Sequence, residues 1–506
     1  MPNEIITLVF VHGWSVTSMD TYGELPLRLK NEGLKNGLTL DVQEIFLGRY
    51  ISFHDEVRLP DISRAFQAAV NDQLSGVIAA GRRFMCITHS TGGPVIRDWW
   101  KTYWKSSGKC PMSHLIMLAP ANHGSSLAQL GKARIGRIKS WFSGVEPGQG
   151  VLDWLELGSI EGWNLNIDWI ENSKDQVGVD GIFPFVLSGQ AIDRKLYDNL
   201  NTYTGEAGSD GVVRVASANI NSRHVVLSQP ALSLDPQGNI IPLDFTPGTI
   251  ATAPKTALRV VRMKSHSGSD MGIMNSVLQD STDIKSADTV SAILQCISVK
   301  NDSDYQQVCD DFAAKTDEIQ KDEQLETETD LLIINRYFIH DRYSMVVFRV
   351  RDHKGYPVTD FDLVLTAGPG DDPNHLPEGF CADRQRNRLN PEIITFYFNF
   401  DILNGCDAIM EGSKVVRPAI KPTTMLGLHI YPRPVNGFVR YMPCQVKASA
   451  ALFSSVLLPN TTTLVDIELQ RIVDKEVFRT EQLTDDLSLL KKDFKDIVPG
   501  NSFTDS

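Results

Sequence analysis

The stretch FMCITHSTGGP, residues 84 to 94, runs from an apolar segment through small residues to a proline. Proline is favoured in the first turn of a helix, because the N–H group that it lacks would have no partner there. A strand, a sharp turn and a helix in this order are typical of a nucleophile elbow, which presents a serine hydroxyl above a sheet. The pattern predicts that Ser90 is a nucleophile. The alternative is an ordinary strand–loop–helix connection with a capping serine.

Apolar runs and helical patterns alternate on both sides of this stretch. Residues 5–11 form a continuous apolar run, as expected of a strand that is covered on both faces. Further strands are predicted at residues 38–47, 83–88, 115–119, 182–187 and 257–261, and helices at 61–78, 94–104, 193–200 and 284–297. This alternation predicts an α/β fold with a doubly wound, mostly parallel sheet.

The regular pattern lapses at about residues 125–181. Four of the eight tryptophans, Trp141, Trp154, Trp163 and Trp169, lie in this window. One interpretation is an insertion whose aromatic side chains pack on the core. The other is a lid or cap that binds an acyl chain, since a large apolar surface beside a serine suits a lipid. On the second interpretation, Trp141 and Trp154 would contact substrate.

The composition and the hydrophobic pattern of the sequence change after residue 300. Residues 301–330 contain eleven Asp or Glu and two Lys, and they predict an acidic helical linker. Short alternating runs separated by turn residues follow, which predicts an antiparallel β-sandwich over residues 331–480. Residues 481–506 form a tail with one amphipathic helix at 485–497. Residues 1–300 are expected to form the first domain.

Composition restricts the function classes. A chain of 506 residues is expected to contain two or three domains, and a net charge of −13 argues against nucleic acid as a partner. The seven cysteines show no C-x-x-C pair and no metal spacing, which indicates reduced thiols. We therefore expect no cofactor and no catalytic metal. A structural calcium ion stays open as an alternative, although no ligand set for it can be read from the sequence.

The first residues contain no basic segment or cleavage site, which predicts a chain without a signal peptide that is cytoplasmic as synthesised. No apolar stretch approaches the roughly 20 residues that span a bilayer. A membrane surface and a protein partner are the two candidates for what the C-terminal region binds.

A serine nucleophile needs a base and a carboxylate that orients the base. In a fold of this topology the order along the chain is Ser, then Asp or Glu, then His. This order assigns Ser90 as the nucleophile, Asp210 as the acid and His266 as the base. The backbone N–H groups of Trp14 and Thr91 are expected to form the oxyanion hole.

Other titratable residues offer alternatives. His224 is the rival base, although its apolar neighbours suggest a strand, and Asp270 is the rival acid. His89 is expected to face the site without serving as the base. His12 is expected to brace the oxyanion loop.

Together these motifs resemble the α/β-hydrolase superfamily, and more closely its bacterial lipases and phospholipases. The resemblance covers about residues 1–290 and is carried by His12-Gly13-Trp14, Thr88 to Gly93, Asn122 to Ser125, Ser209 to Val213 and His266. Thr88 stands where the usual motif has glycine, a change seen among lipases of this superfamily. The overall layout is similar to that of lipase effectors delivered by type VI secretion, which implies export by that route.

The resemblance implies a serine hydrolase that cleaves carboxylic esters of lipids through an acyl-enzyme. Two alternatives stay open at this stage. One is a binding or adaptor protein that keeps the fold without the chemistry. The other is an acyltransferase that uses the same three residues but passes the acyl group to an alcohol or an amine.

Overall fold

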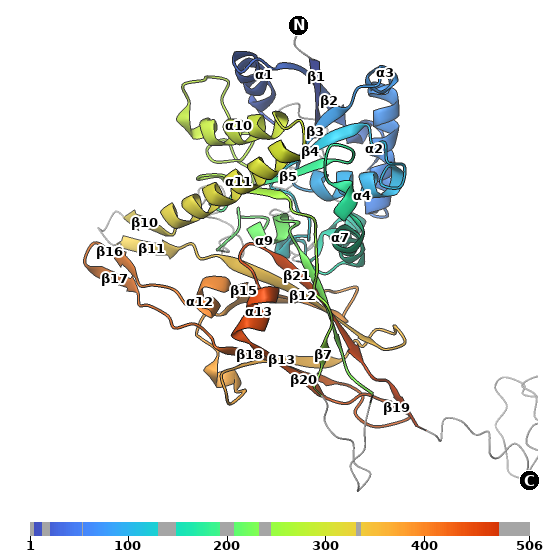
Figure 1. The fold of residues 1–506 in the computed structure, drawn as a ribbon, viewed down its shortest axis with the longest axis vertical. Helices are drawn as coiled ribbons and strands as arrows, with labels where there is room; N and C mark the ends of the chain where they lie inside the picture. Colours follow the sequence, from blue (N-terminus) through green and yellow to red (C-terminus); the bar gives the residue numbers. More distant parts are fainter. Residues whose placement is uncertain are drawn as a thin grey trace, which may run out of the picture.

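The computed structural model describes residues 5–12, 21–52, 54–129, 148–192, 207–231, 244–329 and 335–474 (Figure 1). The first part of the chain is built on a six-stranded sheet in the order β2-β1-β3-β4-β5-β9, with every neighbouring pair parallel. Its strands are β1 (Ile5–His12), β2 (Thr39–Phe46), β3 (Phe84–His89), β4 (Met112–Leu118), β5 (Phe183–Ser188) and β9 (Ala257–Val260). The predicted doubly wound parallel sheet is confirmed.

Helices cover both faces of this sheet, and β1 shows why its sequence is apolar throughout. Leu8 and Phe10 join the core on one face, whereas Val9 and Val11 join the core on the other. The first face is covered by α1 (Leu25–Lys35), α10 (Ile284–Ile297) and α11 (Asp302–Asp322), and the second by α2 (Leu59–Gln73), α4 (Gly92–Tyr103), α6 (Gln149–Leu155) and α7 (Ile160–Asn172). Figure 1 shows the two groups of helices on opposite sides of the sheet.

A second, seven-stranded sheet contains segments from both halves of the chain. Its order is β14-β15-β12-β21-β6-β7, and β8 pairs with β6. The strands are β6 (Arg223–Ser228), β7 (Thr246–Pro247), β8 (Ala251–Thr252), β12 (Tyr343–Asp352), β14 (Cys381–Arg386), β15 (Ile393–Asn399) and β21 (Thr462–Leu469). Strand β21 is parallel to both β12 and β6, and the other pairs are antiparallel. Strands β6, β7 and β8 therefore share a sheet with β12, β14, β15 and β21, which lie far later in the chain.

The remaining sheets of the described C-terminal region are antiparallel, as predicted. Strands β13 (Phe361–Ala367), β18 (Met425–Pro432) and β20 (Cys444–Ser449) form a three-stranded sheet. This sheet shares a core with the seven-stranded one, to which Phe348 and Phe396 contribute from one side and Leu365 and Ile430 from the other. Two-stranded sheets are formed by β10 (Leu325–Thr329) with β11 (Asn335–Ile339), β16 (Ile409–Glu411) with β17 (Lys414–Arg417), and β19 (Val439–Arg440) with β22 (Ile472–Val473).

Helix α11 occupies most of the acidic segment and packs on β9. Its buried residues recur at helical spacing, so Cys309, Phe312 and Ile319 face the sheet while the acidic side chains face outward. The Tyr305 hydroxyl donates a 2.7 Å hydrogen bond to the carbonyl oxygen of Pro184 on β5. Helix α11 is thus one of the helices that cover the six-stranded sheet, and it also connects this sheet to the C-terminal strands.

Short helices complete the described part of the chain. They are α3 (Ser75–Ala79), α9 (Val215–Ala218), α12 (Phe400–Asn404) and α13 (Ala450–Val456), with 3-10 turns at Leu47–Arg49, Lys174–Gln176 and Pro373–His375. Over the described ranges, no helix combines the length and apolar character that a bilayer crossing requires. The helices predicted at 193–200 and 485–497 lie outside the described residues, as does the tail from 481.

Candidate active site

Ser90 lies in a sharp turn between β3 and α4. Its φ angle is +53°, in the left-handed region that residues with a side chain rarely adopt. Hydrogen bonds fix the turn to the end of β4: the Ser90 N–H donates to Leu118 at 3.0 Å, and the Ala121 N–H donates to the Ser90 carbonyl at 3.1 Å. Backbone strain that is held in this way is typical of a functional turn.

Close packing explains the small residues after Ser90. A Cβ on Gly93 would lie 2.6 Å from the Cβ of Pro120, and one on Gly92 would lie 3.0 Å from the Cβ of Thr88. Thr88 itself is fully buried. The elbow tolerates threonine at the position of the usual glycine because Gly92, which faces it, has no side chain.

Three side chains from distant parts of the chain meet at this turn. The Nε2 atom of His266 lies 3.0 Å from the Ser90 Oγ, and its Nδ1 atom lies 2.9 Å from the Asp210 Oδ2. A carboxylate oxygen accepts hydrogen bonds, so Nδ1 carries the hydrogen, and Nε2 accepts the hydrogen of the serine hydroxyl. The structure thus brings together the three residues that the sequence predicts, in the arrangement that nucleophile activation requires.

The acid is held by its own loop. The Asp210 Oδ1 accepts hydrogen bonds from the N–H groups of Val212 at 3.0 Å and Val213 at 2.7 Å. The N–H of His266 donates to the Asp210 carbonyl oxygen at 2.9 Å, which ties the loops of acid and base together. Both the Asp210 and the His266 side chains are completely buried.

The rival residues lie elsewhere. His224 is on β6, where its Nδ1 lies 2.7 Å from Glu171 and its Nε2 lies 3.0 Å from Asp466. Asp270 is exposed. His224 is thus bonded to two carboxylates of other elements, Glu171 and Asp466.

Thr91, the first predicted donor of the oxyanion hole, directly follows Ser90. It directly precedes α4, so its N–H lies at the positive end of the helix dipole. Within the described residues this N–H donates no backbone hydrogen bond, which leaves it available. Trp14, the predicted second donor, lies outside the described residues.

The predicted substrate-contacting residues have different surroundings. The His89 Nε2 lies 3.0 Å from the backbone carbonyl oxygen of His266, so His89 faces the site. Trp154 is 2% exposed and belongs to the main core beside α2 and α4, which favours the packing interpretation. Trp141 lies outside the described residues. His12 is buried at the end of β1, where it stacks on Phe46, and burial lowers its pKa to about 4.

Sequence reasoning missed the contacts that hold the acid loop. Arg214 follows Asp210 by four positions and is 2% exposed, and it forms an ion pair with Asp383 on β14. Arg214 is the one basic residue in a loop of small and apolar residues, which was a signal that its side chain needs a buried acidic partner. The sequence around Arg214 does not indicate that its partner is Asp383, 169 positions later.

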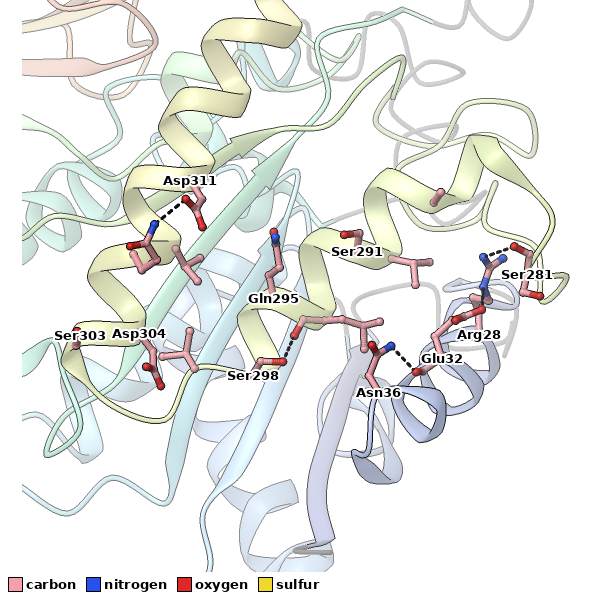
Figure 2. A pocket seen from close by; sticks show the side chains of 16 residues that line it. Arg28, Glu32, Asn36, Ser281, Ser291, Gln295, Ser298, Ser303, Asp304 and Asp311 are labelled. Carbon is pink, nitrogen blue, oxygen red and sulfur yellow. Dashed lines mark hydrogen bonds and ion pairs between the residues drawn. The ribbon is translucent and has the colours of Figure 1, made fainter.

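A large groove lies away from these residues. It measures about 870 Å³ and is bounded by α1, α10 and α11 (Figure 2). Its polar side chains largely bond within their own helices, as Glu32 does with Arg28 at 3.2 Å and Asp311 with Gln307 at 2.8 Å. None of the predicted site residues lines it. Among the described residues no cluster of three or more His, Cys, Asp or Glu side chains could hold a metal ion.

Comparison with solved structures places the chain among known proteins. No protein-family model and no curated protein sequence matches it. The structure of phospholipase PlaB from Legionella pneumophila in complex with thio-NAD is 39% identical, covers 95% of this chain and 97% of that chain, and superposes with a TM-score of 0.79. A second PlaB structure is 40% identical over 95% and 96% of the two chains, with a TM-score of 0.80. With the parallel sheet and the serine elbow, this similarity over nearly the full length shows that the chain belongs to the family of the phospholipase PlaB.

Proposed function

We propose that this protein hydrolyses carboxylic esters of lipids, with phospholipids as its substrates. The observation that carries the proposal is the position of the His266 ring, which bridges Ser90 at 3.0 Å and Asp210 at 2.9 Å. The similarity to PlaB, a phospholipase, supports the substrate class.

The proposed reaction has two halves. In the first, the Ser90 Oγ attacks the ester carbonyl while the His266 Nε2 accepts the serine proton, and the resulting tetrahedral oxyanion receives the Thr91 N–H. His266 then donates the proton to the leaving alcohol, which departs from an acyl-Ser90 intermediate.

In the second half, His266 takes a proton from water, and the resulting hydroxide attacks the acyl-Ser90 carbonyl. The fatty acid leaves, and His266 returns the proton to the Ser90 Oγ. Asp210 keeps the His266 ring in the required tautomer throughout and stabilises it when it is positively charged. Each step is carried by side chains and backbone of this chain together with water.

The test uses the full-length protein on phosphatidylglycerol and phosphatidylcholine vesicles and on p-nitrophenyl esters. Ser90→Ala should lower the rate of fatty-acid release by at least about 10⁴-fold and should abolish labelling by a fluorophosphonate. The exposed Ser107 offers a control, since Ser107→Ala should keep both. Full activity of Ser90→Ala would overturn the proposal. Transfer of the acyl group to an added alcohol, without free fatty acid, would assign an acyltransferase instead.

A further inference from the structure

The loop that carries Asp210 rests against two tyrosines of the seven-stranded sheet. The Tyr397 hydroxyl, on β15, lies 3.1 Å from the carbonyl oxygen of Ala207 and 3.2 Å from that of Gly208, so it donates to the start of the loop. The ring of Tyr343, on β12, stacks on the Tyr397 ring with a centroid separation of 4.6 Å and an interplanar angle of 12°. The two rings form a buried stack, and the loop lies against its edge.

Gly208 shows how closely the loop approaches this surface. Its φ angle is +73°, and an added Cβ would lie 2.5 Å from both the Tyr343 ring and the Tyr397 hydroxyl. A side chain at this position would therefore push the loop away from the sheet. The tyrosine pair therefore limits where the backbone of the loop can lie.

The other end of the loop is held by charge. The Arg214 guanidinium lies over the Tyr397 ring, 4.1 Å from the centroid, and forms an ion pair with Asp383 of β14. Ser209 and Arg214 form an isolated β-bridge that closes the loop around Asp210. A buried guanidinium without its carboxylate is costly, so the ion pair constrains where the end of the loop lies.

Between these two anchors lies the carboxylate that contacts His266. Asp210 has one oxygen on the N–H groups of Val212 and Val213 and the other at 2.9 Å from the His266 Nδ1. A displacement of about 1 Å at such a contact can cost 10²-fold in rate. The tyrosine and Asp383 anchors are thus placed to set the geometry of the acid–base pair.

We propose that Tyr397 and Asp383 are positioning residues for the reaction, acting through Asp210, with Tyr343 as the surface that orients Tyr397. The C-terminal sheet is then part of the catalytic apparatus and more than an accessory for binding. This inference rests on the proposed function, because it assumes that Asp210 orients His266.

The test compares Tyr397→Phe, which removes the hydroxyl and keeps the ring, with Tyr441→Phe. Tyr441 is a matched control because it is also buried in the C-terminal region, but its hydroxyl lies 3.3 Å from Asp352. Tyr397→Phe should lower kcat for a soluble ester about 10-fold to 100-fold with little change in KM. Asp383→Asn should act in the same direction, and Tyr441→Phe should keep the wild-type kcat. Thermal unfolding and circular dichroism verify that each variant is folded.

A double-mutant cycle separates positioning from general stability. If Tyr397 acts through Asp210, then adding Tyr397→Phe to Asp210→Asn should change the residual kcat by less than about twofold. An unchanged kcat in folded Tyr397→Phe and Asp383→Asn, or a full additional loss in the Asp210→Asn background, would overturn the inference and leave the proposed function standing. Wild-type activity of Asp210→Asn would show that Asp210 does not orient the base, which overturns the inference, whereas loss of the proposed function itself would appear as the absence of fatty-acid release by the wild-type protein.

Discussion

The Nε2–H of His89 donates to the backbone carbonyl oxygen of His266 at 3.0 Å, and the two rings lie 4.6 Å apart. A carbonyl oxygen only accepts, so the hydrogen of the His89 ring is on Nε2. Burial, with the neighbouring His266, holds the pKa of His89 well below its ordinary value of 6.5. His89 is therefore a neutral donor that fixes the backbone of the proposed base from the residue next to the nucleophile.

Replacing His89 should slow the reaction without preventing substrate binding. His89→Phe removes the donor, and the loss of one hydrogen bond of about 1–1.5 kcal/mol predicts a kcat about tenfold lower, with KM unchanged. Steady-state kinetics on a soluble ester measure both. The exposed His375 supplies the control, since His375→Phe should keep the wild-type kcat. An unchanged kcat in His89→Phe would show that the contact has no part in positioning the base.

Alanine substitutions at two helical glycines should change the free energy of unfolding in opposite directions. Gly93→Ala places a methyl group 2.6 Å from Pro120, so it should destabilise the fold by about 1–3 kcal/mol and lower activity. Gly76, in α3, has open space around its Cβ position, so Gly76→Ala should raise the free energy of unfolding by about 0.5–1 kcal/mol. Urea unfolding of both variants tests the pair. Equal stability of Gly93→Ala and wild type would contradict the close packing at the elbow.

Acid should destabilise the first domain through its buried histidines. Burial lowers the pKa of His114 to about 4 and that of His123 to about 3, from 6.5. The unfolded chain then binds protons that the folded chain does not, so the free energy of unfolding should fall as the pH drops from about 6.5 to about 4. Each histidine contributes about 1.4 kcal/mol per pH unit in this window.

Urea unfolding between about pH 4.5 and 7 measures this slope. His123→Gln should reduce it by about one proton, whereas replacing the exposed His54 with glutamine should leave it unchanged. A slope that is the same in wild type and His123→Gln would refute the neutral, buried state of His123.

The stabilising contribution of His224 to the fold should be lost at alkaline pH. Burial opposes its protonation, but the hydrogen bonds and charges of Asp466 and Glu171 together raise its pKa above 6.5. Its stabilising contribution is therefore complete below about pH 6.5 and is lost as the pH rises through the raised pKa. The stability difference between wild type and His224→Gln should be largest near pH 6 and smallest near pH 9. If the stability difference between wild type and His224→Gln did not vary with pH, the positive charge of His224 would not be what stabilises its contact with Glu171 of α7.

The turn at Ser90 and the meeting of Ser90, Asp210 and His266 could be predicted because each of the three residues lies in a short local pattern. Residues 84–94 contain a strand, a turn and a helix start within one stretch, and Ser90, Asp210 and His266 each follow a predicted strand or lie in a loop of small residues. The start of α2 was predicted less well. Asp61 is the third residue of the helix and accepts the Arg58 N–H at 2.9 Å, so it caps from inside the first turn.

Long-range pairing could not be predicted. The neighbours of His224 suggested a strand, but its partner β21 lies about 240 residues later, and apolar alternation carries no information about which strands pair. Strands β14 and β20 have little local signal, because CADRQR and CQVKAS contain few of the residues that favour strands. The apolar face of α11 was also overlooked, because its charge dominates the average composition.

The pairing of strand β6 restricts how this chain can be divided or fused. The strand lies between the acid and the base in the sequence, yet its parallel partner belongs to the last described long strand. A fragment that stops near residue 300 would keep the loops of Asp210 and His266 but leave β6 with an open edge, which is a template for aggregation. We therefore expect such a fragment to aggregate, and a circular permutation or fusion should preserve the return of the C-terminal strand to β6.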